Sequence, residues 1–445
     1  MNDPMILKDF WVYTGGVHGE FFFGGVVIED DQIAHVFRGQ PPHEYEVQGG
    51  TIRGYGKILM PAHTNCHTHV YSAFARGLSV SPFHPENFLQ ILEQLWWKLD
   101  QKLNEQDIYY SGLISALDMI RNGVGSFIDH HASPSCIKGS LQILHQSMVE
   151  VAGLRGVFSY ETSDRYGKDK TREAIEENWG FLDWIQQRKQ SKMTNGLMGL
   201  HASFTLEDST LKEIADIPIP IHVHVAEGIE DGELHVDRYG MSAIQRLHRY
   251  GLIRDSSVLA HCIHINQEDG LIIQSQKAFI VVNPQSNMNN GVGLPLINRF
   301  WSWDIPVLLG NDGFGADITR DMRTLLLSQH HTEKSPIGFG LEDLYRVAWE
   351  QNSDILSRLF GIPIGKIEAG YGADLITYDY TPPTPMDQSN FGGHFYYGIM
   401  ETERPRDLIV AGHFLLENGE LILPLRDICA EAQKWAQKFW QRVQE

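Results

Sequence analysis

The chain has 445 residues, 42% hydrophobic and 21% charged, which is the composition of an ordinary globular protein rather than a disordered or fibrous one. Its formal net charge of −20 argues against nucleic acid and anionic membrane surfaces as partners, because both select basic patches. The sequence also predicts neither a membrane span nor a signal peptide, since it lacks a long apolar run and a basic N-terminal segment followed by an apolar core.

Residues 1–57 alternate short apolar runs with Gly, Asp and Pro turn signals, a pattern typical of short β-strands. We expect strands over 6–13, 21–28, 33–37 and 51–53. The same pattern returns after residue 361, at 373–379, 407–411 and 420–423, and a final helix is expected over 426–443. We expect the two terminal groups of strands to meet as one small β-sandwich.

From about residue 58, short apolar runs alternate with longer helical segments. Eight runs are expected to be strands: 57–69, 125–131, 156–161, 197–203, 219–227, 257–262, 278–283 and 305–312. Eight β–α alternations favour an α/β fold, a (β/α)8 TIM-like barrel, although an open doubly wound sheet shares this rhythm. The expected domains are an N-terminal β-sandwich segment (1–57), the barrel (58–366), a second β-sandwich segment (367–425) and a C-terminal helix (426–445).

Polar and titratable side chains gather at the ends of the predicted strands. In chain order these residues are His67, His69, Asp129, His130, His131, Glu161, His201, His222, His224, Glu227, His261, Asn283 and Asp312. Catalytic groups of such barrels lie at the carboxyl ends of the strands, and buried polar groups are costly without partners. The accumulation therefore predicts an active site at one rim of the barrel.

His67 and His69 are two residues apart, so in a strand both imidazoles face the same way. In the fifth run, His224 lies nearer the exit of the strand than His222 and is therefore the better ligand. Three imidazoles and a carboxylate from Asp312 are a typical hydrolytic site for zinc or a similar divalent ion. A lone Asp in this position could equally cap a helix, and a lone His261 is more often a core residue. The combined order favours a metal site over both alternatives.

Weaker signals surround this set. The amides of Asn283 and Asn287 could bind substrate, although Asn-Pro also marks a plain turn. His130 and His131 could contact substrate or compete for metal. Trp96 and Trp97 lie in an amphipathic segment and are expected to be core or interface residues rather than pocket residues.

The chain resembles the amidohydrolase superfamily, in the branch that holds guanine, cytosine and adenosine-type deaminases and triazine hydrolases, and within it the SsnA-type aminohydrolases. The resemblance runs essentially end to end. It rests on the strand-end order His-x-His, His-x-x-Glu, His, Asp and on the strings at 96–100, 110–114, 129–134, 286–290, 365–375 and 382–385.

The resemblance implies a role for each strand-end residue. His67, His69 and His224 would bind the metal, with Asp312 as further ligand and base. Glu227 would carry a proton to the leaving nitrogen, His261 would orient the water or stabilise developing charge, and His201 would line the pocket. No lysine ends the fourth run, where binuclear relatives carry one, so a single divalent ion is expected: zinc, with iron and manganese as alternatives.

The predicted function is hydrolysis of carbon–nitrogen bonds, with deamination of a purine- or pyrimidine-like heterocycle and release of ammonia. Guanine itself is not expected, because the guanine-binding context is not recognisable. The alternatives are cleavage of a cyclic or N-acyl amide, a chlorohydrolase at the same metal, or a non-catalytic metal-binding scaffold. The four cysteines show no paired spacing and predict reduced thiols in a cytoplasmic protein, and we further expect a homodimer.

Overall fold

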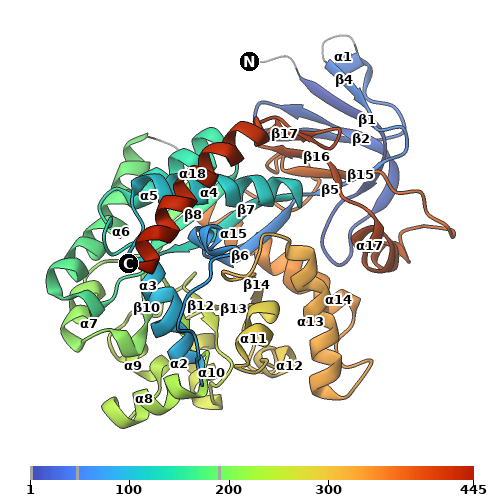
Figure 1. The fold of residues 1–445 in the computed structure, drawn as a ribbon. Helices are drawn as coiled ribbons and strands as arrows, with labels where there is room; N and C mark the ends of the chain where they lie inside the picture. Colours follow the sequence, from blue (N-terminus) through green and yellow to red (C-terminus); the bar gives the residue numbers. More distant parts are fainter. Residues whose placement is uncertain (1–3, 47–49, 189–191) are drawn as a thin grey trace.

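The computed structural model describes residues 4–46, 50–188 and 192–445. A barrel of parallel strands wrapped by helices makes up most of the chain, and a β domain built from both ends of the chain lies beside it (Figure 1). Within the described residues, no helix is both long enough and apolar enough to cross a membrane.

The barrel contains two parallel sheets that continue into each other. The first sheet has β6 (His63–Thr68), β7 (Val124–His131), β8 (Arg155–Tyr160) and β9 (Thr194–Gly196). The second has β10 (Met198–Ala202), β11 (Ile221–Val225), β12 (Val258–His261), β13 (Phe279–Val282) and β14 (Val307–Leu309). Because only Leu197 separates β9 from β10, these two strands occupy one position of the barrel.

Hydrogen bonds close both seams between the sheets. At the first seam, Thr162 N donates to Gly199 O at 3.0 Å, next to an isolated bridge that pairs Thr162 with Leu200. At the second, Asp312 N donates to His67 O at 3.0 Å, and a parallel bridge pairs Thr68 with Asp312. The eight-stranded barrel is thus confirmed, and the open-sheet alternative is excluded.

Helices follow the barrel strands and cover their outer faces (Figure 1). The longer ones are α4 (Glu105–Arg121), α6 (Lys168–Arg188), α8 (Ile229–Tyr239), α10 (Gln267–Ser275), α13 (Ile318–Glu333) and α15 (Asn352–Phe360). α4 begins at a capping box, in which the Asn104 side chain accepts from Asp107 N and the Asp107 carboxylate accepts from Asn104 N. The strands are largely buried, and β12, β13 and β14 carry the aliphatic runs expected for a parallel sheet covered on both faces.

The two ends of the chain form one nine-stranded sheet. Its strands are β1 (Met5–Tyr13), β2 (Phe21–Glu29), β3 (Gln32–Arg38), β4 (Gly50–Arg53), β5 (Ile58–Pro61), β15 (Leu375–Tyr378), β16 (Pro405–Val410), β17 (His413–Glu417) and β18 (Glu420–Leu421). β5 joins the two groups, since it pairs with β1 on one side and β15 on the other.

The position of β5 corrects the expected boundary at residue 57. The run expected as one barrel strand over 57–69 is two strands, β5 in the terminal sheet and β6 in the barrel. The chain therefore enters the barrel after Pro61, because the backbone groups of β5 are already paired with β1 and β15.

The C-terminal helix α18 (Leu425–Gln444) lies across the barrel against α4 (Figure 1). Trp440 Nε1 donates to Phe74 O at 2.7 Å, and Arg442 pairs with Asp107 of the α4 capping box. The buried ring of Phe439 lies beside Phe74. Aromatic packing therefore helps to hold this helix against the barrel.

Candidate active site

Three strand exits bring the four candidate ligands together at the carboxyl end of the barrel. His67 lies on β6, His69 directly follows it, His224 lies on β11, and Asp312 comes three residues after β14. Asp312 has a φ of 57°, a left-handed conformation that non-glycine residues rarely adopt. Such local strain is typical of functional sites, and here it occurs at a residue that turns its carboxylate inward.

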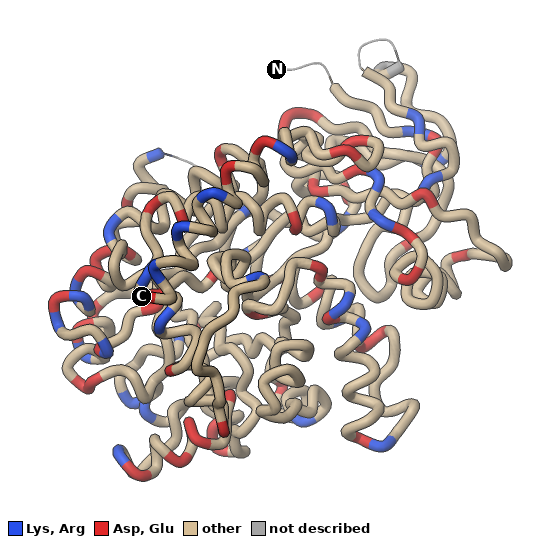
Figure 2. Tube along the Cα trace, viewed as in Figure 1, with Lys and Arg blue, Asp and Glu red and all other residues tan. Residues whose placement is uncertain are grey.

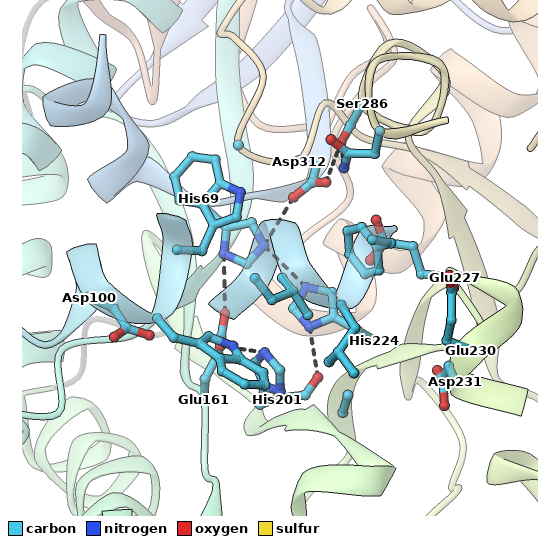
Figure 3. A pocket seen from close by; sticks show the side chains of 18 of the residues that line it. His69, Asp100, Glu161, His201, His224, Glu227, Glu230, Asp231, Ser286 and Asp312 are labelled. Atoms are coloured by element: carbon cyan, nitrogen blue, oxygen red, sulfur yellow. Dashed lines mark hydrogen bonds and ion pairs between the residues drawn. The ribbon is translucent and has the colours of Figure 1, made fainter. Parts of the chain in front are cut away.

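The Nε2 atoms of His69 and His224 point their lone pairs toward each other. His69 Nδ1 donates to His130 O at 2.6 Å, and His224 Nδ1 donates to His201 O at 2.7 Å. Because a carbonyl oxygen only accepts, both Nδ1 atoms carry hydrogen and both Nε2 atoms are free to bind. The two Nε2 atoms are 3.1 Å apart, which is a repulsive contact unless a cation lies against both (Figure 3).

His67 and Asp312 complete this donor set. His67 Nδ1 lies 2.9 Å from Nε2 of His222, whereas its own Nε2 is buried without a hydrogen-bond partner and is 3.7 Å from Asp312 Oδ1. The same oxygen is 3.1 Å from His69 Nε2. Three imidazole nitrogens and one carboxylate oxygen fit a divalent metal ion, and His222 acts behind them by holding the His67 ring.

The electrostatics of the centre agree with cation binding. Burial alone would lower the pKa of His69, but the hydrogen bond and charge of Asp312, with the charge of Glu161, raise it to about 9. Burial likewise opposes ionisation of Asp312, yet the neighbouring His69, His261 and His67 hold the pKa of this carboxyl well below its usual range. His69 Nε2 therefore binds positive charge strongly, beside a carboxylate that stays ionised.

Glu227 and His261 form a second pair next to the donor set. Glu227 Oε2 is 3.3 Å from His261 Nε2, and His261 Nδ1 donates to Asn287 Oδ1 at 2.8 Å. Burial raises the pKa of Glu227 well above its usual value and lowers that of His261. A carboxyl whose pKa is raised holds its proton more firmly than a free one and is suited to donate it, while the ring of His261 presents an acceptor nitrogen.

A cavity opens directly onto this centre (Figure 3). Its inner end is lined by His69, His224, Glu227 and Asp312, and His201 lies in its wall as the sequence predicted. Asp312 does not cap a helix, since the N-cap of α13 is Asp317. Instead its Oδ2 accepts from Ser286 Oγ at 2.6 Å.

Several residues of the site are missed or misjudged from the sequence. Trp96 and Trp97 line the cavity, so the expectation that they are only core or interface residues is wrong. Glu161, whose carboxylate is 3.3 Å from His69 Nδ1, is visible in the sequence only as a strand end, and Ser286 only as part of a turn. The sequence does hold a signal for Glu161, because this residue directly follows β8 and so lies at a strand end like the other site residues.

Four residues expected to bind substrate lie elsewhere. His130, His131, Asn283 and Asn287 are wholly buried and are not among the residues that line the cavity. Their placement gives no support to a substrate contact, because none of the four side chains lines the cavity that opens onto the centre. Asn287 instead orients His261, and the His131 ring bonds Ser133 Oγ at 3.0 Å. The His130 ring stacks on His222 at 4.2 Å, and it offers a nitrogen within 4.8 Å of those of His67, His69 and His224.

Comparison with known proteins agrees with this geometry. The model of the amidohydrolase family matches residues 58–421. A 5'-deoxyadenosine deaminase of Methanocaldococcus jannaschii is 24% identical over 409 residues, covering 89% of this chain and 92% of that protein. A 5-methylthioadenosine/S-adenosylhomocysteine deaminase of Desulfitobacterium hafniense is 27% identical over 423 residues, covering 93% of each chain.

Among solved structures, an adenosine deaminase from Xanthomonas campestris with bound zinc superposes with a TM-score of 0.81 at 18% identity, covering 98% of both chains. At this identity the likeness shows the shared fold. The family match, by contrast, spans nearly all of the barrel together with most of the C-terminal strands. The chain belongs to the amidohydrolase family and is a metal-dependent hydrolase of carbon–nitrogen bonds.

Proposed function

We propose that the protein is an aminohydrolase that uses one zinc ion to remove an amino group from a purine- or pyrimidine-like heterocycle as ammonia. One observation carries the proposal. His69, His224, Asp312 with its lowered pKa and Glu227 with its raised pKa all line one cavity. Zinc is favoured by the nitrogen-rich donor set and by the zinc bound in the solved adenosine deaminase relative.

His67, His69, His224 and Asp312 would hold the ion, which supplies a Lewis acid that activates water at neutral pH. Asp312 is placed to take up the proton released by that water, because its low pKa keeps it ionised and Ser286 occupies only its Oδ2. His261 presents a neutral acceptor nitrogen on the same side, which suits it to orient a water rather than to stabilise negative charge.

Glu227 is the group that would protonate the leaving nitrogen. Its carboxyl lies at the inner end of the cavity, and burial raises its pKa well above the usual value, which favours the protonated form. A protonated carboxyl in reach of a leaving amine is an efficient general acid. Release of ammonia needs such a donor, since an amide anion is a very poor leaving group.

The walls of the cavity suit a flat ring. Aromatic side chains of Trp96, Trp97 and Phe204 line it, and aromatic surfaces stack well on heterocycles. Both deaminase relatives are named for adenosine-type compounds, which supports a purine-like ring for this chain as well. The expected homodimer and the cytoplasmic location stay predictions.

The proposal is tested by measuring ammonia release from a panel of amino-substituted purines, pyrimidines, their nucleosides and triazines, using protein of known zinc content. Ammonia should form in proportion to zinc-loaded protein and should be absent with Asp312→Asn. Chloride or a ring-opened product without ammonia would instead establish the chlorohydrolase or amidase alternative. If no panel member is turned over by zinc-loaded protein, the proposed deamination is wrong.

A further inference from the structure

The charge of the cavity sets a limit on what can enter it. Six of its lining side chains are carboxyls: Asp100, Glu161, Glu227, Glu230, Asp231 and Asp312. Among the described residues that line it, none is Lys or Arg. Figure 3 shows Asp100 and Glu161 on one side of His69 and His224, and Glu230 and Asp231 on the other. Carboxyl groups therefore line both sides of the cavity and are not confined to the metal end.

Asp312 and Glu227 are accounted for by the reaction, and Asp231 accepts from Ala226 N at 2.7 Å and lies 2.8 Å from His235 Nδ1. The reaction uses none of the other three carboxyls. Glu161 is buried and its closest ionic contacts are imidazoles, at 3.3 Å from His69 Nδ1 and 3.9 Å from His201 Nε2. Glu230 is partly exposed and makes no ion pair with a Lys or Arg of the described residues. Asp100 is buried, and this burial raises its pKa to about 8.

One arginine approaches this region, and it does not supply an anion site. Arg165 lies over the ring of Trp97, with Cζ 4.4 Å from the ring centre, and its Nη2 is 3.8 Å from Asp100 Oδ2. It is not among the residues that line the cavity, whereas Trp97 and Asp100 are. Its charge is therefore engaged behind the cavity wall, where it faces Asp100 and the Trp97 ring.

The remaining wall is aromatic, with Tyr71, Phe88, Trp96, Trp97, Phe204 and Phe314. Aromatic faces and carboxylates together attract cations and N–H donors and repel anions. We propose that the substrate is a heterocycle without any anionic group, neutral or carrying an ammonium substituent, and that phosphate-bearing and carboxylate-bearing forms of the same ring are rejected. The inference rests on the proposed function, because it takes the metal end of the cavity as the reacting end.

The test is a charge-matched binding series measured by calorimetry on zinc-loaded, full-length protein. The probes are adenosine, 5'-amino-5'-deoxyadenosine and adenosine 5'-monophosphate, together with the matching cytidine and guanosine sets. For whichever ring binds, the phosphate form should bind at least about 100-fold more weakly than the neutral form, and the amino form at least as tightly as the neutral form. A phosphate form that binds as tightly as its neutral partner would overturn the proposal, and so would a failure of all three rings to bind.

Two variants on α8 test whether the cavity wall causes the weaker binding of the phosphate form. Glu230→Lys should raise the affinity for the phosphate form at least about tenfold, because it places a cation in the wall of the cavity. Glu233→Lys makes the same charge change on the exposed side of the same helix and should leave the preference unchanged. Equal effects of the two variants would contradict selection by the cavity wall.

Ammonia release from the same samples separates this inference from the proposed function. A neutral nucleoside that binds with the expected charge preference but yields no ammonia would sink the deamination and leave the charge selection standing. A phosphate form that is deaminated as fast as the neutral form would contradict the charge selection and leave the deamination standing.

Discussion

His69 Nε2 lies 3.1 Å from Asp312 Oδ1, across the seam at which the first and last strands of the barrel meet. The same two residues share a backbone contact, since His69 N donates to Asp312 O at 3.3 Å. The two side chains are 243 positions apart in the sequence and meet only when the barrel closes. Formation of the metal centre and closure of the barrel are therefore the same structural event.

Removal of the metal should therefore destabilise the whole barrel. A ligand that binds only the folded state adds about 4 kcal/mol to the free energy of unfolding at 1,000 times its Kd. We expect a chelator to lower the melting temperature of the zinc-loaded protein clearly, and re-addition of zinc to restore it. Asp312→Asn, which weakens the centre, should show a much smaller chelator effect. Equal melting temperatures with and without chelator would show that the seam is stable without a cation.

Replacement of Glu227 by Gln should slow the reaction without loss of the metal. The amide keeps the shape of the side chain but has no acidic proton, so kcat should fall by about 10²–10⁴-fold, the usual contribution of a general acid. Zinc content and melting temperature should stay close to those of the wild type, because Glu227 is not among the four proposed ligands. Glu233→Gln, on the exposed side of α8, is the control and should keep wild-type kcat. A near-normal kcat in Glu227→Gln would remove this residue from the mechanism.

The barrel and the donor set could be predicted because each strand is a local pattern. Apolar runs that end in His69, His224 or Asp312 are visible without any tertiary information, and parallel strands bring their ends to one rim. The boundary at β5 could not be read in this way. Ile58–Pro61 is separated from the barrel strand β6 by Ala62 alone, with no turn signal between them, and only its pairing with β1 and β15 assigns it to the other sheet.

The cavity wall was the least predictable region of the site. Trp96 and Trp97 lie on an amphipathic segment whose apolar side packs against the core in most proteins, and here it also covers the active site. The orientation of Asn287 toward His261, rather than toward a ligand, depends on α11 (Pro284–Asn290) lying beside β12. Neither relationship leaves a periodic signal in the sequence.

The ion pair between Arg155 and Asp374 should matter more to stability than any surface pair. It is bidentate, at 2.7 and 3.1 Å, with both side chains buried, and it joins barrel strand β8 to the segment that leads into β15. Loss of one partner leaves an unpaired buried charge, which costs about 3–5 kcal/mol. Asp374→Ala should lower the free energy of unfolding by this amount in urea titrations.

The matched control for that variant is Glu20→Ala, which breaks the pair with Arg38. Both side chains of that pair are about 60% exposed, at 61% and 59%, so its loss should cost less than about 1 kcal/mol. Similar losses of stability in Asp374→Ala and Glu20→Ala would show that the two domains do not depend on the buried pair.

His145 should make the protein less stable in weak acid, independently of the metal centre. The side chain is buried against Trp184, with ring centres 4.9 Å apart, and burial lowers its pKa from 6.5 to about 4, although Glu150 opposes the shift. Because the folded pKa is the lower one, the unfolded chain binds the extra proton between pH 6.5 and 4. The contribution of His145 to stability is therefore complete above about pH 6.5 and falls as the pH drops, by at most about 1.4 kcal/mol per pH unit.

Urea titrations across this pH range give the free energy of unfolding as a function of pH. In His145→Gln this free energy should fall less steeply with decreasing pH than in the wild type, whereas His413→Gln, at an exposed position, should keep the wild-type dependence. Since both variants retain the metal ligands, acid effects at the centre cancel in the comparison, and parallel curves for wild type and His145→Gln would contradict the role of His145.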